Sequence, residues 1–410
     1  MRRLLVPVLA LVTACEGEEA LDLSLDDEDG AEYEGWDGGK ADGTSGLGGP
    51  IQFSRACEAG EQITVAAVGD VLLHGTLQQQ AVRHPERFRS LWAPMVDLLY
   101  SADVTYANLE GPVAPGLTAS GREVTDPGFV FDNAVYTGYP RFNYHPNIAA
   151  DLSIDGVDVV STANNHSLDR GSAGADRTLD WLREYGVAFT GSRERGDTES
   201  PWSTTTSTRG VTLAWLACTF STNGIPDRHD QVLDCWGDET RIKSIIGELR
   251  ATPGIDAVVV TPHWGVEYTA RPTRAQRSLA KRFLEAGATL ILGAHPHVLQ
   301  PWEKVVTADG RETFVIYSLG NFVSGQSDLP RRSTLILYVG LTKTDSGVHV
   351  NGVRYVPLVM NTRDGVRAVE PIDRAGGSAA SRKLTTDMFG TVNLLAPEGP
   401  LVTNPGCDRG

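Results

Sequence analysis

Along most of the chain, short runs of β-branched and other apolar residues alternate with stretches of helical periodicity. Two of the periodic stretches predict amphipathic helices, over 173–185 and over 274–286. The second begins with the capping-box pair Thr273 and Gln276 and stops at Gly287. Because strands and helices alternate, we expect an α/β domain. The predicted strands are 63–68, 104–107, 157–162, 211–217, 257–261, 289–292 and 314–318.

After Arg332 the pattern changes to strands alone, over 335–341 and 352–358. Such strands suggest antiparallel additions at the edge of a sheet. The sequence contains no internal repeat and no linker that would mark a second folded domain. We therefore expect one domain over 62–360, followed by a C-terminal extension, 361–410, that packs on it.

The first fifteen residues resemble a bacterial lipoprotein signal peptide. Two arginines precede an apolar stretch over 4–12 that is too short to span a membrane. The stretch leads into Val-Thr-Ala-Cys, which resembles the sequence around a lipidated cysteine. We therefore expect a signal peptide over 1–15 and a lipid on Cys15. The alternative is an ordinary signal peptide that happens to be followed by a cysteine. Glu16 follows in place of an aspartate, and resemblance to the enterobacterial sorting rule then implies the outer membrane. The expected location is the cell envelope, lipid-anchored in the membrane and either periplasmic or surface-exposed.

The negative charge of the chain is concentrated in the next segment. Residues 16–50 hold twelve acids and nine glycines against one lysine, with too little apolar content to offset the entropy of ordering. We therefore expect an acidic disordered tether over 16–61. Of the net charge of −16, residues 16–50 contribute −11 and the two N-terminal arginines +2, which leaves −7 for residues 51–410. Since no basic surplus exists to displace counterions from phosphates, nucleic acid is not an expected partner.

Four cysteines remain after Cys15, and an even number in a secreted protein indicates disulfides. Three pairings are possible. We favour Cys218–Cys235, which are close in sequence and flank a polar loop, and Cys57–Cys407, which would hold the two ends of the domain together. A zinc site is the rival interpretation, but the sequence lacks the CxxC spacing that such sites commonly use.

Polar residues that a core should exclude follow six of the predicted strands. Ligands of α/β sheets bind at the carboxyl ends of the strands, so these residues are expected to meet at one edge. Each alone has a structural explanation, because a strand-end aspartate is often a helix cap and a single histidine is often a hydrogen-bonded core residue. Their recurrence after six strands favours a site. The segments are GD at 69–70 with His74 beyond it, NLEG at 108–111, NNHSLDRG at 164–171, PHWGVEY at 262–268, GAHPH at 293–297 and SLGNF at 318–322.

The candidate ligands offer oxygen and nitrogen but no thiolate, which suits Mn²⁺, Fe or Zn²⁺. Carboxylates that bridge two ions, with imidazoles in the remaining positions, form a two-metal hydrolytic centre. Asn165 suits a neutral oxygen ligand beside His263 and His295. The adjacent His166 is then free to act as a general acid, with Asp169 orienting its ring.

The chain resembles the CapA family in six motifs, in order and spacing: AAVGDVLLHG, ANLEGPV, STANNHSLDRG, TPHWGVEY, GAHPHVLQPWE and YSLGNFVSG. The family comprises bacterial poly-γ-glutamate capsule synthesis proteins, whose domain is similar to calcineurin-like metallophosphoesterases. The resemblance covers roughly residues 63–325. It implies a four-layer αββα sandwich of the metallophosphoesterase type, in which helices flank two central sheets.

The resemblance also implies roles for individual residues. It matches His166 to the catalytic histidine, beside Asp169, and implies a divalent metal held by Asp70, Glu110, Asn165, His263, His295 and His297. Metallophosphoesterases usually open with Asp-x-His, but Leu72 stands two residues after Asp70, and His74 is the nearby substitute. Glu110 also stands where the bridging acid is usually the shorter aspartate. The resemblance therefore implies either one ion or two.

We expect a metal-dependent hydrolase or transferase-like enzyme in the synthesis, anchoring or processing of a poly-γ-glutamate-like capsule polymer. His166 and Asp169 favour catalysis, because binding alone requires no general acid. The missing Asp-x-His favours the alternative, a non-catalytic metal-containing scaffold for polymer binding or export. A phosphodiesterase is a third hypothesis. The implied partners are an envelope polymer or small anionic substrate and the membrane proteins of capsule synthesis.

Overall fold

The computed structural model of the chain describes residues 47–374 and 377–407. The expected signal peptide, Cys15 and residues 16–46 of the expected tether lie outside the described residues. Among the helices within the described ranges, none combines the length and apolar character needed to cross a membrane.

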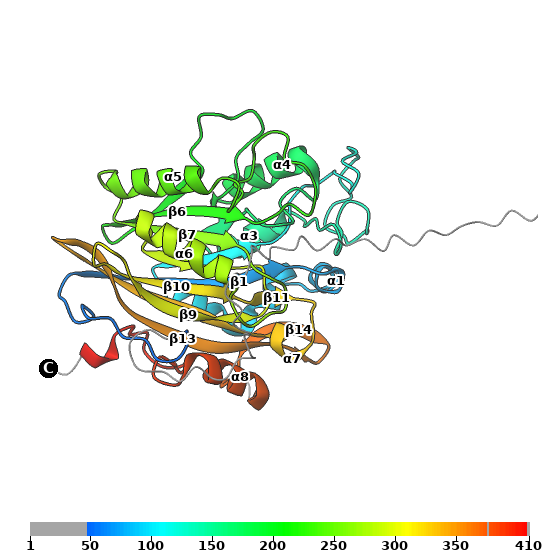
Figure 1. The fold of residues 1–410 in the computed structure, drawn as a ribbon. Coiled ribbons are helices and arrows are strands. Elements are labelled where there is room, and N and C mark those ends of the chain that lie inside the picture. Colours follow the sequence, from blue (N-terminus) through cyan, green and yellow to red (C-terminus); the bar gives the residue numbers. More distant parts are fainter. Residues whose placement is uncertain (1–46, 375–376, 408–410) are drawn as a thin grey trace, which may run out of the picture. The chain divides into compact units, whose positions relative to one another are not determined.

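Two β-sheets face each other at the centre of the described domain (Figure 1). Tyr106 and Trp215 stack between them with ring centroids 5.6 Å apart. The larger sheet has eight strands. Seven of them follow one another in the spatial order β14 (Val366–Pro371), β13 (Gly347–Arg363), β12 (Ser333–Thr344), β1 (Glu61–Leu72), β2 (Val104–Leu109), β3 (Val159–Ser161) and β4 (Ala188–Thr190). The eighth, β11 (Asn321–Ser324), pairs with β1 outside this order. The smaller has six, in the order β5 (Ser203–Thr208), β6 (Val211–Thr219), β7 (Ala257–His263), β8 (Leu290–Leu292), β10 (Glu312–Leu319) and β9 (Leu299–Val306).

Helices cover the outer face of each sheet and complete four layers. An apolar cluster joins the larger sheet to α1 (Gly75–Arg83), η1 (Arg87–Leu91), η2 (Ala93–Met95), α2 (Val96–Tyr100), α3 (Asn147–Ile154) and α4 (Gly171–Glu184). A second cluster joins the smaller sheet to α5 (Glu239–Ala251) and α6 (Arg274–Ala286). The remaining helices are α7 (Leu329–Arg332), α8 (Ala379–Phe389) and η3 (Pro405–Cys407). This arrangement confirms the expected αββα sandwich (Figure 1).

The predicted helices and strands are all present. At the start of α6, the Gln276 N–H donates to Thr273 Oγ1 at 3.1 Å and the Thr273 N–H donates to Gln276 Oε1 at 2.8 Å, so the predicted capping box forms. Strands β12 and β13 add to β1 in antiparallel fashion, also as predicted. The strands that the pattern missed are β4, β5, β9, β11 and β14. Four of these are sheet edges. Strand β5 consists of serine and threonine alone, and β4 and β11 are only three and four residues long.

The chain passes from one sheet to the other at Gly320, between the end of β10 and the start of β11. Gly69 in β1 permits this crossing, because a Cβ atom there would lie 1.7 Å from the carbonyl oxygen of Gly320. The same oxygen accepts a hydrogen bond from the Asp70 N–H at 3.0 Å. The carboxyl ends of the two sheets are therefore held together beside Asp70.

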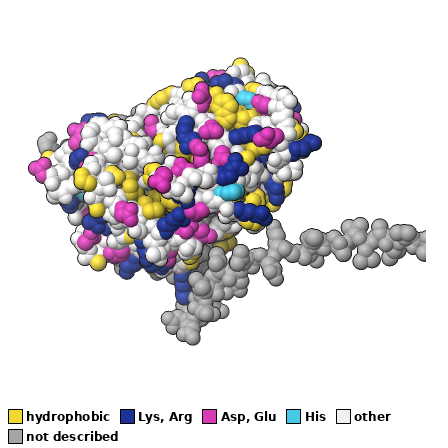
Figure 2. Space-filling view, turned by 90° about the horizontal axis from the view of Figure 1, so that it is seen from above, with side chains coloured by type: hydrophobic (Ala, Val, Ile, Leu, Met, Phe, Trp, Pro, Cys, Tyr) yellow, Lys and Arg dark blue, Asp and Glu magenta, His cyan; other side chains and the backbone are white. Residues whose placement is uncertain are grey.

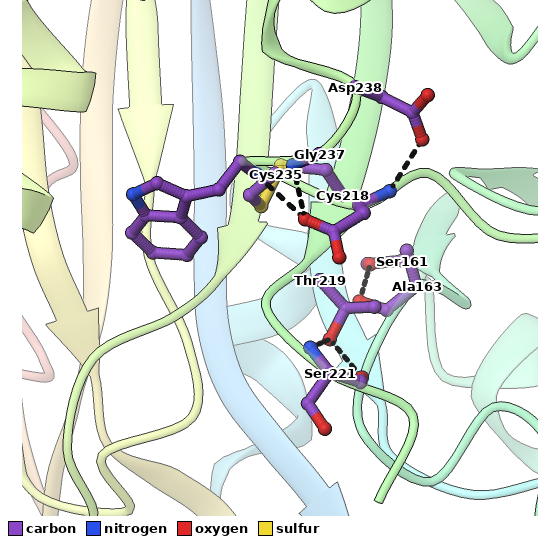
Figure 3. Close-up of a disulfide and its surroundings, with 10 residues drawn as sticks. Ser161, Ala163, Cys218, Thr219, Ser221, Cys235, Gly237 and Asp238 are labelled. Carbon is purple, nitrogen blue, oxygen red and sulfur yellow. Dashed lines mark hydrogen bonds between the residues drawn. A yellow bond between two sulfur atoms is a disulfide. The ribbon is translucent and has the colours of Figure 1, made fainter. Parts of the chain in front are cut away.

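Both favoured disulfides are present, which confirms the predicted pairing. Cys57–Cys407 joins residues 350 positions apart and ties the beginning of the described domain to its end. Cys218–Cys235 closes the loop that follows β6 (Figure 3).

Residues 47–57, which belong to the stretch expected as tether, lie against the domain. The Gly48 N–H donates to the carbonyl oxygen of Trp302 at 2.7 Å. Ile51 and Phe53 are buried, with 7% and 5% of their surface exposed. These two apolar side chains stabilise the contact, so packing on the domain begins upstream of residue 61.

Acidic and basic side chains are interspersed on the molecular face seen in Figure 2. Some form ion pairs, such as Arg241 with Asp230 at 2.8 Å. Exposed pairs of this kind contribute roughly 0–1 kcal/mol each. The stability of the fold therefore depends mainly on the two helix–sheet clusters and on the packing between the sheets.

Candidate metal centre

Strand ends from both sheets bring all six expected metal ligands together in the interior. Because the carboxyl ends of both sheets meet beside Asp70, residues that are distant in sequence become neighbours. Each of the six is at most 3% exposed. They are Asp70 in β1, Glu110 after β2, Asn165 after β3, His263 at the end of β7, and His295 and His297 after β8.

Glu110 is completely buried, and in the described part of the chain neither of its carboxylate oxygens has a hydrogen-bond partner. Its Oε1 lies 3.6 Å from Nε2 of His263 and 3.7 Å from Nε2 of His297. Burial raises the pKa of Glu110 well above the usual range. Since a buried carboxylate without donors is costly, this arrangement favours a cation between these atoms.

His263 and His295 lie side by side, with ring centroids 4.9 Å apart. Nε2 of His263 is 2.9 Å from Oδ1 of Asn165, and Nδ1 of His295 is a buried nitrogen with no hydrogen-bond partner among the described residues. Burial lowers the pKa of both imidazoles well below the usual range. Both rings are therefore neutral near pH 7 and keep a nitrogen lone pair for a metal.

Asp70 orients the ring of His297. Nδ1 of His297 donates to Oδ2 of Asp70 at 3.0 Å, and the other Asp70 oxygen accepts from Nδ2 of Asn108 at 2.8 Å. Burial disfavours a charged His297, but the carboxylates of Glu110 and Asp70 outweigh it and raise the pKa to about 9. The contact directs Nε2 toward Glu110, as carboxylate–histidine pairs do at metal sites.

The backbone of the two histidines is strained. His295 has φ +95° and His297 has φ +57°, values that residues other than glycine rarely adopt. Backbone hydrogen bonds between this loop and the end of β7 hold the conformation, including Ala294 N–H to Pro262 O at 3.0 Å. Strain that the surroundings maintain in this way is typical of functional sites.

His166 and Asp169, the residues expected to be catalytic, form a buried pair. Nδ1 of His166 donates to Oδ2 of Asp169 at 2.8 Å. The same oxygen accepts the Phe142 N–H at 2.7 Å, and the Phe142 ring packs edge-on against the imidazole with centroids 4.7 Å apart. The orientation of the His166 ring is therefore fixed by a carboxylate and by an aromatic neighbour.

Two overlapping groups of described side chains have a spacing that could hold a metal ion. One is Asp70, Glu110 and His297, the other is Glu267, His295 and His297, and within each group the candidate ligand atoms lie within 4.8 Å of one another. All donors are oxygen or nitrogen, as divalent transition metals accept. Together with the unpartnered oxygens of Glu110, this donor set fits a divalent metal.

Three residues that were not among the predicted ligands also contribute to the centre. Asn108 donates to Asp70, and Glu267 belongs to the second metal-sized group. Asn321 pairs with Asp70 across β1 and β11, and its Nδ2 donates to the His297 carbonyl oxygen at 3.1 Å. Each lies in a polar segment already recognised at a strand end, but the sequence does not show which residue of such a segment faces inward.

A segment next to the Cys218–Cys235 disulfide contacts the same centre. Phe220 follows Cys218 by two residues, and its N–H donates to the His263 carbonyl oxygen at 2.9 Å. The Phe220 ring centroid is 4.3 Å from that of His295. The disulfide therefore anchors a segment that contacts two expected ligands.

Residues 64–326 match the family model described as bacterial capsule synthesis protein PGA_cap. The chain is 30% identical over 336 residues to the capsule biosynthesis protein CapA of Bacillus anthracis, covering 80% of this chain and 74% of that protein. It is 33% identical over 190 residues to the PGA biosynthesis protein CapA of Bacillus subtilis (strain 168), covering 46% of this chain and 48% of that protein. The match thus spans about half the length of the second relative.

A similar solved structure is the calcineurin-like phosphoesterase YfkN from Bacillus subtilis. The two share 13% sequence identity with a TM-score of 0.42, over 80% of this chain and 96% of that chain.

Proposed function

This chain belongs to the bacterial capsule synthesis protein family PGA_cap, and on that premise we propose that it is a metal-dependent hydrolase or transferase-like enzyme of the cell envelope. The proposed substrate is a poly-γ-glutamate-like capsule polymer, processed during its synthesis or anchoring. A smaller anionic molecule built from the same units would suit the same site.

The observation that carries the proposal is the environment of Glu110. A completely buried carboxylate whose two oxygens lack donors within the described residues is costly unless a cation compensates it. Nε2 of His263 and Nε2 of His297 face the same oxygen at 3.6 and 3.7 Å. Separations of this size suit ligands that share one ion at bond lengths of about 2.0–2.2 Å.

We propose that the six buried ligands hold one or two ions of Mn, Fe or Zn. Such a metal, when bound, polarises the oxygen of the bond to be cleaved and lowers the pKa of a bound water. The ligands assigned to it are Asp70, Glu110, Asn165, His263, His295 and His297.

His166 is the proposed general acid. Its Nδ1 proton is committed to Asp169, so Nε2 is the nitrogen that can deliver a proton to the leaving group. Asp169 keeps this tautomer and stabilises the imidazolium before the proton is transferred. Because Asp169 also accepts the Phe142 N–H, the carboxylate is itself held in place.

One observation favours a second candidate, a non-catalytic scaffold that binds the polymer around a structural metal. Leu72 stands where an Asp-x-His motif would supply a histidine, and its side chain belongs to the apolar cluster on the helix side of the sheet. A centre with fewer ligands on one ion would hold that ion less tightly.

The test uses the full chain, stripped of metal with a chelator and reloaded with Mn²⁺ or Zn²⁺, and a panel of γ-glutamyl peptides and phosphoesters. We expect metal-dependent cleavage of the γ-glutamyl substrates, with a loss of about 10²–10⁴-fold in His166→Ala. His229→Ala, in an exposed loop, is the matched control. Metal uptake without turnover would favour the scaffold, and turnover of phosphoesters alone would favour a phosphodiesterase. Absence of metal uptake would overturn all three.

The proposal also includes attachment to the envelope by a lipid on Cys15, with the acidic segment as tether and the outer membrane as the expected site. Membrane proteins of capsule synthesis are the proposed partners. Incorporation of labelled palmitate into the wild-type chain but not into Cys15→Ser, together with release of that variant from the membrane fraction, is the expected result. Equal labelling of the two chains would contradict it.

A further inference from the structure

We propose that Glu267 is a further metal ligand, at the position that it forms with His295 and His297. The inference concerns the same centre as the proposed function and rests on it. It assigns a ligand role to a residue of the loop after β7, on the opposite sheet from Leu72.

Leu72 and the Nδ1 atom of His74 are engaged in packing and hydrogen bonding rather than open to a metal. Leu72 is 2% exposed and packs with the apolar side chains between the larger sheet and its helices. His74 accepts a hydrogen bond from the Gly325 N–H on Nδ1 at 3.1 Å. Its ring packs edge-on against Phe142, with centroids 5.5 Å apart. Nδ1 of His74 is therefore occupied by a contact within the protein.

Glu267, in the loop after β7, approaches the metal centre from the smaller sheet. Its Oε1 lies 3.9 Å from Nε2 of His297, and Oε1 of Glu110 lies 3.7 Å from the same nitrogen. Nδ1 of His297 is engaged by Asp70 at 3.0 Å. His297 therefore lies between two carboxylates, one from each sheet. Glu267 forms a metal-sized group with His295 and His297, whereas Glu110 forms a separate group with Asp70 and His297.

His295 provides the independent sign that a cation is needed here. It is 3% exposed, and its Nδ1 is a buried nitrogen with no hydrogen-bond partner in the described part of the chain. A buried polar atom without a partner is costly. The space between Glu267, His295 and His297 is therefore suited to a cation.

Backbone hydrogen bonds fix the loop that carries Glu267 to the loop that carries the histidine ligands. The Trp264 N–H donates to the Ala294 carbonyl oxygen at 3.0 Å, and the Tyr268 N–H donates to the Pro296 carbonyl oxygen at 2.8 Å. Tyr268 adopts φ +61° to make the second contact. The backbone on both sides of Glu267 is thus hydrogen-bonded to the segment that carries His295 and His297. These bonds fix the position of Glu267 relative to the two histidines.

The exposure of Glu267 makes it a suitable residue to test. Its side chain is 41% exposed, so Glu267→Gln removes the negative charge without opening a cavity in the core. Glu248→Gln makes the same change on an exposed residue of α5 and serves as the matched control.

The experiment is calorimetric titration of the metal-stripped full chain with Mn²⁺ and with Zn²⁺, and the bound ions are counted by elemental analysis. We expect two ions per wild-type chain and per Glu248→Gln chain. In Glu267→Gln one ion should bind at least about tenfold more weakly, because a charged ligand is lost, while the other keeps its affinity. Glu267→Asp, which keeps the charge on a shorter side chain, should fall between the two.

Other outcomes separate the two proposals. If the wild type binds metal and Glu267→Gln binds the same number of ions with the same affinities, the role of Glu267 is overturned while the metal centre stands. If the wild type takes up no metal, the metal centre fails, and the role of Glu267 fails with it.

Discussion

Nδ1 of His297 lies 3.0 Å from Oδ2 of Asp70, and this hydrogen bond joins a histidine of the smaller sheet to the central strand of the larger one. The two residues are 227 positions apart in the chain. The contact shows how the carboxyl ends of both sheets build one centre. It also gives Asp70 a role in orienting His297, because the bond determines which ring nitrogen faces Glu110.

Replacing Asp70 with asparagine tests this contact. In the metal-stripped protein, Asp70→Asn should lower the pKa of His297 from about 9 toward 6.5, because a neighbouring negative charge is removed. Metal affinity should fall by about 10–100-fold. Histidine-selective NMR titration and calorimetry measure the two effects. The control Asp97→Asn removes a carboxylate from an exposed pair with Arg374 and should change neither the pKa of His297 nor the metal affinity. Similar changes in Asp70→Asn and Asp97→Asn would contradict a role of Asp70 in orienting His297.

The two disulfides allow a paired prediction. Removing Cys218–Cys235 by Cys218→Ala/Cys235→Ala should cost about 3 kcal/mol in free energy of unfolding, as expected for a short loop. Because Phe220 contacts His263 and His295, this variant should also bind metal more weakly.

Removing the other disulfide, by Cys57→Ala/Cys407→Ala, should lower stability but leave metal affinity unchanged, because it lies at the ends of the described domain. Urea unfolding and metal titration of both variants provide the comparison. Equal losses of metal affinity in the two variants would show that the position of Phe220 is unimportant.

His145 should make stability depend on pH. Its ring packs against Phe129 and Tyr136 with centroids 4.8 and 5.1 Å away, and burial lowers its pKa to about 4. The unfolded chain therefore binds a proton at this site between pH 6.5 and 4 that the folded chain does not, so its contribution to stability is lost as pH falls through this window.

The slope from this one proton is at most about 1.4 kcal/mol per pH unit. Chemical unfolding of wild type and His145→Gln at pH 7, 6, 5 and 4 measures it, with His229→Gln as control because His229 is exposed. The His145 variant should lose stability less steeply on acidification than the wild type. Parallel curves for all three proteins would refute the assignment.

Much of the centre could be predicted from the sequence because its ligands stand directly after apolar strands. Asp70 and His263 end such strands, and within each sheet the carboxyl ends of parallel strands lie at one edge. The crossing at Gly320 then brings the two edges together. The pairing of Cys57 with Cys407 could also be favoured, since it joins the ends of one domain. Local pattern was sufficient in these places because the buried strands are strongly apolar.

The rest depends on tertiary contacts that leave no local pattern. Glu267 lies in a loop, and its approach to His297 depends on backbone bonds to Ala294 and Pro296. The sequence of β5, Ser-Thr-Thr-Thr-Ser-Thr, is polar because the strand is a sheet edge, so it lacks the apolar alternation by which strands are recognised.

A divalent cation is proposed to compensate Glu110, and thermal unfolding of the metal-stripped full chain and of Glu110→Gln measures this compensation. Without metal, the variant should be at least as stable as the wild type, because it no longer buries a carboxylate without donors. On addition of Mn²⁺ or Zn²⁺ at 100 times the Kd, the wild type should gain about 2.7 kcal/mol and the variant much less. Equal gains in both proteins, or none in the wild type, would contradict the claim.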